Sequence, residues 1–238
     1  MQKLLKFHIL FIINAAIFAC TSNEAVPPAP LTAEQKNQSL ILEAASHIRT
    51  GDIVLRCGKD VTSYKIREMS VTDKTYSHAG IAVVRNDSVL IYHITPPELD
   101  EPKSDTALRL EPLQKFAKAE NNFEIGIARF PLTQEQVNSL VQYCDSLYIN
   151  KTSFDFLFDL KSDKKMYCSE MLDKAIGHAT ADSIRLKQNA FRDHGLVKKV
   201  AGYLKAEEKV VQSRMYIPIE NIYLHPSCEM IKQFKFSN

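Results

Sequence analysis

Apolar residues along this chain follow two spacings, one typical of helices and one typical of strands. The first helical stretch follows Thr32, which forms a capping-box pattern with Gln35. Its apolar residues recur at helical spacing at Leu40, Ile41, Ala44, Ala45 and Ile48. We therefore expect a helix that starts just after Thr32 and buries one face.

Strand patterns follow this helix. "GDIVLRC" predicts a turn and a strand, and residues 79–85 and 88–94 are two runs rich in β-branched residues. Asn86 and Asp87 join these runs, and both residue types tolerate the backbone geometry of a tight turn. The pattern therefore predicts a β-hairpin, with a further strand at 123–130.

The next helix is expected after Thr133, which fits a capping box with Gln136. Cys144 falls on the apolar face of this helix, so it is interpreted as a small buried hydrophobe. After a loop over 150–166, "YCSEMLDKAIG" predicts a helix that has Cys168 in its first turn and ends at Gly177, since glycine is common at helix C-termini.

Three further segments are less regular. Residues 98–122 are a polar excursion with a short helix, and residues 180–211 predict more helix with loops. "RMYIPIENIYL" predicts a closing strand and turn. Several consecutive strands with flanking helices indicate the α+β class, an antiparallel sheet packed against a helix that carries a cysteine.

The first residues predict export. Lys3 and Lys6 precede an apolar run that is too short to span a bilayer but suits a signal peptide over 1–19. "IFAC" is similar to a bacterial lipobox, which predicts lipidation of Cys20. A non-lipidated signal peptide or an uncleaved anchor is the alternative.

We expect a Pro-rich tether over 20–38 and a catalytic domain over 39–238. The protein would then be exported and held at the cell envelope by a lipid, facing the periplasm or the surface.

Charge adds one exclusion. The chain has 30 Lys and Arg against 28 Asp and Glu, and Lys3 and Lys6 of the leader account for that excess. A balanced mature domain gives no reason to expect a nucleic-acid partner.

Cysteine spacing is similarly uninformative about metals. No pair such as C-x-x-C occurs, and Cys57 and Cys228 give no readable signal. We expect no metal and no cofactor.

The chemistry-bearing residues are His78, His93 and Cys168. Antiparallel pairing of the predicted hairpin brings His78 and His93 to the same end. A thiol in the first turn of a helix meets free N–H groups and a positive partial charge, which lower its pKa. One histidine could then act as base and the second could orient it.

Other readings of these residues stay open at this point. Cys168, Met171, Leu172 and Ala175 also form a helical apolar stripe, so the cysteine could belong to the core. His93 could point into solvent, and two histidines with a cysteine could bind zinc.

"GDIVL", "SHAGIAVV", "YHITP" and "YCSEML" occur here in an order that resembles the permuted papain-like thiol hydrolases of the YiiX type. These enzymes are relatives of the NlpC-type cell-wall endopeptidases. In the unpermuted family the cysteine helix precedes the Gly-Asp strand and the histidine strands. Here it follows them, as it also does in the lecithin:retinol acyltransferase family. The resemblance covers residues 39–176, with a looser match at "YIPIENI".

The resemblance implies a circularly permuted papain-like (NlpC-like) fold in which Cys168 is the nucleophile and His78 the general base. The third polar position falls on His93. Many YiiX-like proteins have a glutamate at this position, whereas "YHITPP" looks more like the acyltransferase relatives. Tyr167 matches a family tyrosine beside the cysteine and could line the cleft or serve packing. Asp155 is interpreted as a loop-capping residue.

Three functions follow from these expectations. The first is a cysteine amidase or peptidase that cleaves a cell-wall peptide or an N-acyl or lipid substrate. The second is an acyltransferase that uses the same thioester. The third is a non-catalytic lipoprotein that binds wall or lipid. The presence of Cys168, His78 and His93 together argues against this third function.

Overall fold

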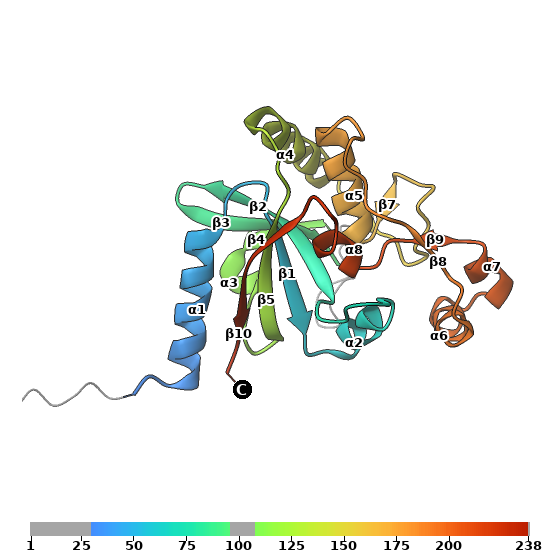
Figure 1. Cartoon of the computed structure of the whole chain (residues 1–238), viewed down its shortest axis with the longest axis horizontal. Helices are drawn as coiled ribbons and strands as arrows, with labels where there is room; N and C mark the ends of the chain where they lie inside the picture. Colours follow the sequence, from blue (N-terminus) through green and yellow to red (C-terminus); the bar gives the residue numbers. More distant parts are fainter. Residues whose placement is uncertain (1–29, 96–107, 238) are drawn as a thin grey trace, which may run out of the picture. The chain divides into compact units, whose positions relative to one another are not determined.

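A six-stranded antiparallel sheet is the centre of the computed structural model, which describes residues 30–95 and 108–237 (Figure 1). The strand order is β10-β5-β1-β2-β3-β4, so the last strand of the chain pairs beside β5 at one edge. The strands are β1 (Ile53–Gly58), β2 (His78–Arg85), β3 (Ser88–Ile94), β4 (Leu108–Pro112), β5 (Asn122–Arg129) and β10 (Glu229–Lys235).

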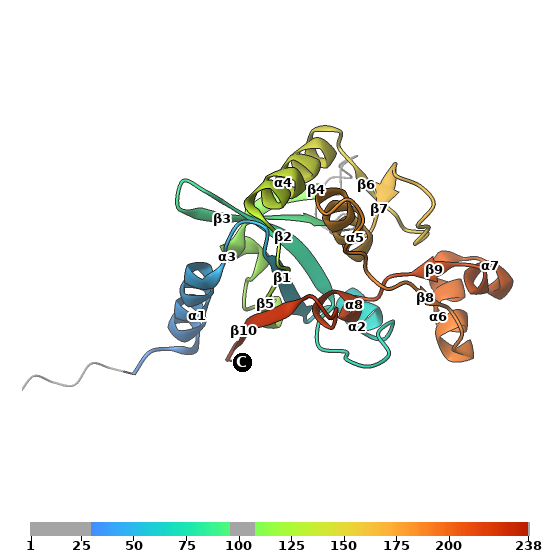
Figure 2. The ribbon, with the colours of Figure 1, turned by 45° about the horizontal axis from the view of Figure 1, so that its top comes forward.

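Helices cover both faces of this sheet (Figure 2). Alternate residues of β1 point to opposite faces, as the pleat requires, and each face has its own core. Ile53 and Leu55 pack with α4 and α5, whereas Val54 packs with α1 and α3. These helices are α1 (Ala33–His47), α3 (Leu113–Phe116), α4 (Gln134–Ile149) and α5 (Cys168–Ala179).

The remaining elements are short. Two-residue strands form a parallel pair and an antiparallel pair outside the main sheet. Among the described residues, no helix combines the length and the apolar character needed to cross a membrane. The short elements are α2 (Val61–Arg67), β6 (Ser153–Phe154), β7 (Lys165–Met166), β8 (Asn189–Ala190), α6 (His194–Leu204), α7 (Glu208–Gln212), β9 (Met215–Tyr216) and α8 (Glu220–Tyr223).

Most of the elements predicted from the sequence are confirmed. The capping boxes at Thr32 and Thr133 both form, with side-chain and backbone hydrogen bonds in each direction. Asn86 and Asp87 take positive φ angles of 48° and 60° and close the β2–β3 hairpin. Cys144 is fully buried. The α+β class is confirmed, with an antiparallel sheet packed against a helix that begins at Cys168.

One helix boundary and one domain boundary differ from expectation. Gly177 does not end its helix, which continues to Ala179. A Cβ at Gly177 would lie 2.8 Å from Cδ of Arg185, so the glycine permits close packing of the segment that follows the helix. At the other end of the chain, α1 begins at Ala33, inside the range expected for the tether.

Two strands were missed. "RMYIPIENIYL" contains only the two-residue β9 and the helix α8, and the long closing strand is β10, further along the chain. β4 lies within the segment that looked like a polar excursion. The signal peptide, Cys20 and residues up to 29 lie outside the described part of the chain.

Candidate active site

The two histidines expected in the site face each other on neighbouring strands. His78 is the first residue of β2 and His93 lies near the end of β3. Nε2 of His78 lies 2.9 Å from Nδ1 of His93, and the rings meet edge to face with centroids 5.1 Å apart. Both side chains are buried, so the predicted proximity of the two rings at the hairpin end is confirmed.

Gly80 explains why the two strands can approach at this point. A Cβ there would lie 2.8 Å from the carbonyl oxygen of Tyr92 and 3.0 Å from Cβ of His93. No side chain fits in that space without moving β3 and its histidine. The glycine of "SHAG" is therefore a requirement of the histidine pair.

Cys168 comes from a helix that packs against β2, the strand that begins with His78. It is the first residue of this helix, α5, and its side chain is buried. The backbone N–H groups of Ser169 and of Ala79, the residue after His78, donate hydrogen bonds to the sulfur and stabilise its thiolate. The positive charge of Arg56 acts in the same direction.

The resting state of this thiol differs from expectation. Burial raises the pKa of Cys168 to about 11, and it outweighs the backbone N–H groups and Arg56. The lowered pKa expected from the helix N-terminus is therefore wrong for the unliganded site. At neutral pH the thiol is protonated, and a base must remove its proton when it reacts.

The histidines are held in the complementary, neutral state. Burial lowers the pKa of His78 well below its usual value, and the positive charge of Arg56 and repulsion from a protonated His93 act in the same direction. Burial also lowers the pKa of His93, although the hydrogen bond to Glu111 opposes that change. Neutral His78 keeps one unprotonated ring nitrogen, which is what a general base needs.

Glu111 is the residue that sequence reasoning missed. It lies on β4, and its Oε1 is 2.8 Å from Nε2 of His93. Lys115, one helical turn further on, pairs with its second oxygen at 2.8 Å. We call His78–His93–Glu111 the hydrogen-bond chain. The buried Phe116 ring packs on both histidines, with centroids 5.8 and 5.1 Å away.

Tyr167 lies at the N-cap of α5 and is buried. Its hydroxyl accepts a hydrogen bond of 2.9 Å from the backbone N–H of Ile217, and its ring packs on Phe158. These contacts match the packing alternative for this residue. Asp155 accepts hydrogen bonds from the backbone N–H groups of Leu157 and Asp159, so its loop-capping role is confirmed.

The "YIPIEN" segment joins the two halves of the site. Ser169 donates a 2.6 Å hydrogen bond to the carbonyl of Ile217, next to the Tyr167 contact. Three residues on, buried Glu220 accepts 2.7 Å hydrogen bonds from three consecutive backbone N–H groups of the loop before His78: Val71, Thr72 and Asp73. One short segment therefore holds both the cysteine helix and the loop that leads to the base.

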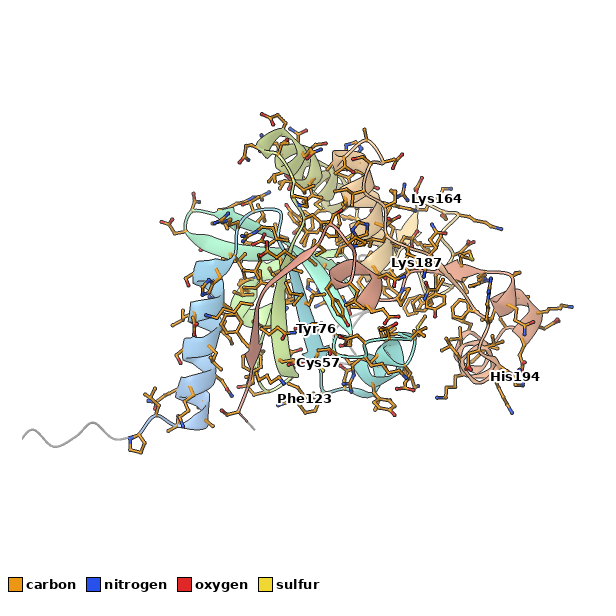
Figure 3. The ribbon with its side chains drawn as sticks, viewed as in Figure 1. Cys57, Tyr76, Phe123, Lys164, Lys187 and His194 are labelled. Atoms are coloured by element: carbon orange, nitrogen blue, oxygen red, sulfur yellow. The ribbon has the colours of Figure 1, made fainter. Side chains whose placement is uncertain are left out.

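Tyr223 and Tyr216 hold the same loop before His78 through further hydrogen bonds. Tyr223 donates to the carbonyl of Asp73 and also meets the ring of Tyr76 edge to face, with centroids 5.2 Å apart. Tyr76, labelled in Figure 3, is fully buried. Tyr216 donates to the carbonyl of Met69. The loop that positions His78 is thus fixed at several points.

Two further observations concern the cysteines and the side chains that can ligate metals. The four cysteines of the described ranges, Cys57, Cys144, Cys168 and Cys228, are free thiols. Within residues 30–95 and 108–237, no three His, Cys, Asp or Glu side chains are arranged to hold a metal ion.

This chain is similar in sequence to a family of enzymes and to a protein of Escherichia coli. Residues 47–216 match a family described as permuted papain-like amidase enzyme, YaeF/YiiX, C92. The chain is 27% identical over 166 residues to the uncharacterized protein YiiX of Escherichia coli K12, which covers 64% of this chain and 75% of that protein.

A solved structure gives the same fold. The crystal structure of the metalloprotein YiiX of Escherichia coli O157:H7 superposes with a TM-score of 0.63 and 19% identity. The match covers 79% of this chain and 99% of the other.

Proposed function

The chain belongs to the permuted papain-like amidase family of the YaeF/YiiX type, and from this premise we propose that it is a cysteine amidase with Cys168 as nucleophile and His78 as general base. The observations that support these roles best are the buried, hydrogen-bonded His78–His93 pair and a thiol at the N-terminus of the helix that packs against the strand of His78. Cysteine-dependent acyl transfer needs this combination of groups.

The first step starts from a neutral thiol and a neutral imidazole. Nε2 of His78 is occupied by His93, so Nδ1 is the nitrogen that accepts the thiol proton. The sulfur attacks the carbonyl carbon of the substrate amide, and the carbonyl electrons move onto oxygen. His78 then donates its proton to the leaving nitrogen, the C–N bond breaks, and a thioester on Cys168 remains.

The second step regenerates the enzyme. Water attacks the thioester carbon and gives its proton to His78, which returns it to the sulfur as the acid product leaves. An amine or alcohol in place of water would give acyl transfer through the same intermediate. The amidase family favours hydrolysis, whereas "YHITP" is the sequence feature that favours transfer.

We also propose that the enzyme is exported and lipid-anchored through Cys20. The basic, apolar and "IFAC" segments of the leader support this location. Its substrates would then be peptides of the cell wall or N-acylated or lipid molecules of the envelope. Cys20→Ala should move the protein out of the membrane fraction. Unchanged fractionation without a lipid label would contradict the anchor.

The test of the activity compares Cys168→Ala with Cys228→Ser in the purified full chain. Cys228 is a partly buried free thiol, so its replacement is a matched control. Cell-wall peptides and N-acyl amino acids are supplied, and mass spectrometry follows new amines, free acids and acyl groups on Cys168. We expect the Cys168 variant alone to lose turnover and the acylated species.

Each other outcome has a defined meaning. Acyl groups on an added amine acceptor, without free acid, would replace hydrolysis by transfer. Binding of wall peptide or lipid at the same affinity in wild type and Cys168→Ala, with no turnover in either, would favour the non-catalytic alternative.

A further inference from the structure

The segment β4–α3 adds an acidic group to the site. Glu111 and Lys115 form an ion pair, and only the lysine is largely exposed, with 59% of its side chain accessible against 11% for the glutamate. The carboxylate therefore faces inward to His93 while its counter-ion lies at the surface. Phe116 covers the two rings from the same segment.

The protonation of Glu111 is well defined. Burial alone would raise the pKa of this carboxyl, but the hydrogen bond to His93, the charge that His93 acquires in acid and the ammonium of Lys115 lower it to about 2. At neutral pH Glu111 is thus a carboxylate, which accepts hydrogen bonds and donates none.

This one fact determines where the protons lie along the whole hydrogen-bond chain. Because Glu111 only accepts, Nε2 of His93 must carry the proton of their 2.8 Å contact. A neutral His93 then has a bare Nδ1, which accepts from Nε2–H of His78 across 2.9 Å. A neutral His78 with its proton on Nε2 has a bare Nδ1, the nitrogen that can take the thiol proton.

We infer that Glu111 is a positioning residue that sets the tautomers of both histidines and so keeps Nδ1 of His78, the nitrogen proposed to accept the thiol proton, unprotonated. The inference rests on the proposed roles of Cys168 and His78. Without the carboxylate, His93 gains by moving its proton to Nδ1, where His78 can accept it. His78 then carries its own proton on Nδ1 and has lost its function as base. In a serine-protease triad, a carboxylate-to-amide change that imposes the wrong tautomer lowers kcat by about 10⁴.

The test uses Glu111→Leu, Glu111→Gln and the control Lys115→Met in the full chain. The Gln variant is informative because Lys115 attracts its carbonyl oxygen, which turns the amide N–H₂ toward His93 and demands the opposite tautomer. We expect both Glu111 variants to lower kcat/KM roughly 10²- to 10⁴-fold. Lys115→Met should change it less than about threefold, since the ammonium is exposed and His93 still donates to the carboxylate.

A second readout does not depend on activity. Long-range ¹⁵N–¹H NMR of the histidine rings reports which nitrogen carries each proton. We expect protons on Nε2 of His78 and His93 in wild type and in Lys115→Met, and on Nδ1 of both in Glu111→Gln. Wild-type rates in both Glu111 variants would overturn the inference, as would a loss of rate with the wild-type tautomers retained. Turnover by Cys168→Ala would instead overturn the proposed function and leave the tautomer result standing.

Discussion

The histidine side and the cysteine side of this site are built from different materials. On the histidine side, side chains from three strands bond to one another in series: His78, His93 and Glu111. On the cysteine side, the sulfur is surrounded by backbone N–H groups, and buried Glu170 accepts from the backbone of Tyr167 through Oε2 at 3.3 Å. The histidine side thus depends on side chains that substitution can remove, whereas the cysteine side depends on backbone groups that only the fold positions.

This difference predicts how each side fails. A side-chain series can be interrupted at one residue while the sheet beneath it stays intact, so changes there should affect rate more than stability. Backbone donors cannot be removed by substitution, and the groups that hold them are buried. Changes on the cysteine side outside Cys168 should therefore affect stability more than rate.

The largest effect is expected for His78→Ala. The protonated thiol loses its only assigned base, so kcat/KM should fall roughly 10²- to 10⁴-fold. Alkylation of Cys168 by iodoacetamide at pH 7.5 should slow as well, because the proton no longer has an acceptor. Peptide mapping by mass spectrometry gives the rate at each cysteine. Equal alkylation rates in wild type and His78→Ala would remove His78 from the mechanism.

Of the two histidine substitutions, His93→Ala should have the smaller effect. It leaves thiol and base in place and removes only orientation, so a fall in kcat of about 10²-fold is expected, smaller than that of His78→Ala. Steady-state kinetics of the two variants side by side checks this ranking. If His93→Ala were the more damaging of the two, the base would have to be reassigned.

Glu170→Gln tests the cysteine side through pH. Burial raises the pKa of Glu170 to about 7, against the opposing effect of Lys174. The folded protein therefore holds this proton over a range in which the unfolded chain releases it, and stability is lost as pH rises from about 4 toward 7. Glutamine can keep the capping hydrogen bond and does not ionise.

The variant should gain stability relative to wild type as pH rises, by on the order of 2 kcal/mol in total. Thermal melts of both proteins at pH 5 and pH 8 measure this, with kcat unchanged within a few-fold. A difference in Tm that stays constant across pH would show that Glu170 does not titrate in this range.

Tyr167→Phe should have the smallest effect. It removes the hydroxyl that accepts from Ile217 and keeps the packed ring, which costs about 1 kcal/mol of unfolding free energy. Urea unfolding measures the loss, and kcat should stay within about threefold of wild type. A loss of rate without a loss of stability would assign Tyr167 to substrate binding rather than to packing.

The sequence was sufficient for the local features of this fold. Capping boxes, the Asn86–Asp87 turn and the hairpin partnership of His78 and His93 all depend on residues close together in the chain. The role of Gly80 could also have been predicted, because a glycine inside an apolar strand indicates close approach of another backbone.

Glu111 could not be found in the same way. In the pairing of β3 with β4, Glu111 lies opposite Ile91 and Arg109 lies opposite His93, so Glu111 reaches His93 diagonally. The sequence does not fix this register. β10 was missed for another reason. Its four charged or amide side chains indicate surface, although an edge strand is where such residues are favoured. The pKa of Cys168 depended on burial, which the helix pattern alone does not give.

The two ends of the domain are joined by a pair of hydrogen bonds. Asn37 of α1 donates to the carbonyl of Ser237 at 3.0 Å and accepts from its N–H at 2.8 Å. A short peptide could therefore connect residue 237 to residue 31 and make the domain a closed ring. Reopening that ring in the loop that carries Lys164 (Figure 3) would place the cysteine helix ahead of the Gly-Asp strand and the histidine strands. A protein permuted in this way would have the chain order of the unpermuted papain-like enzymes and could form every contact described above.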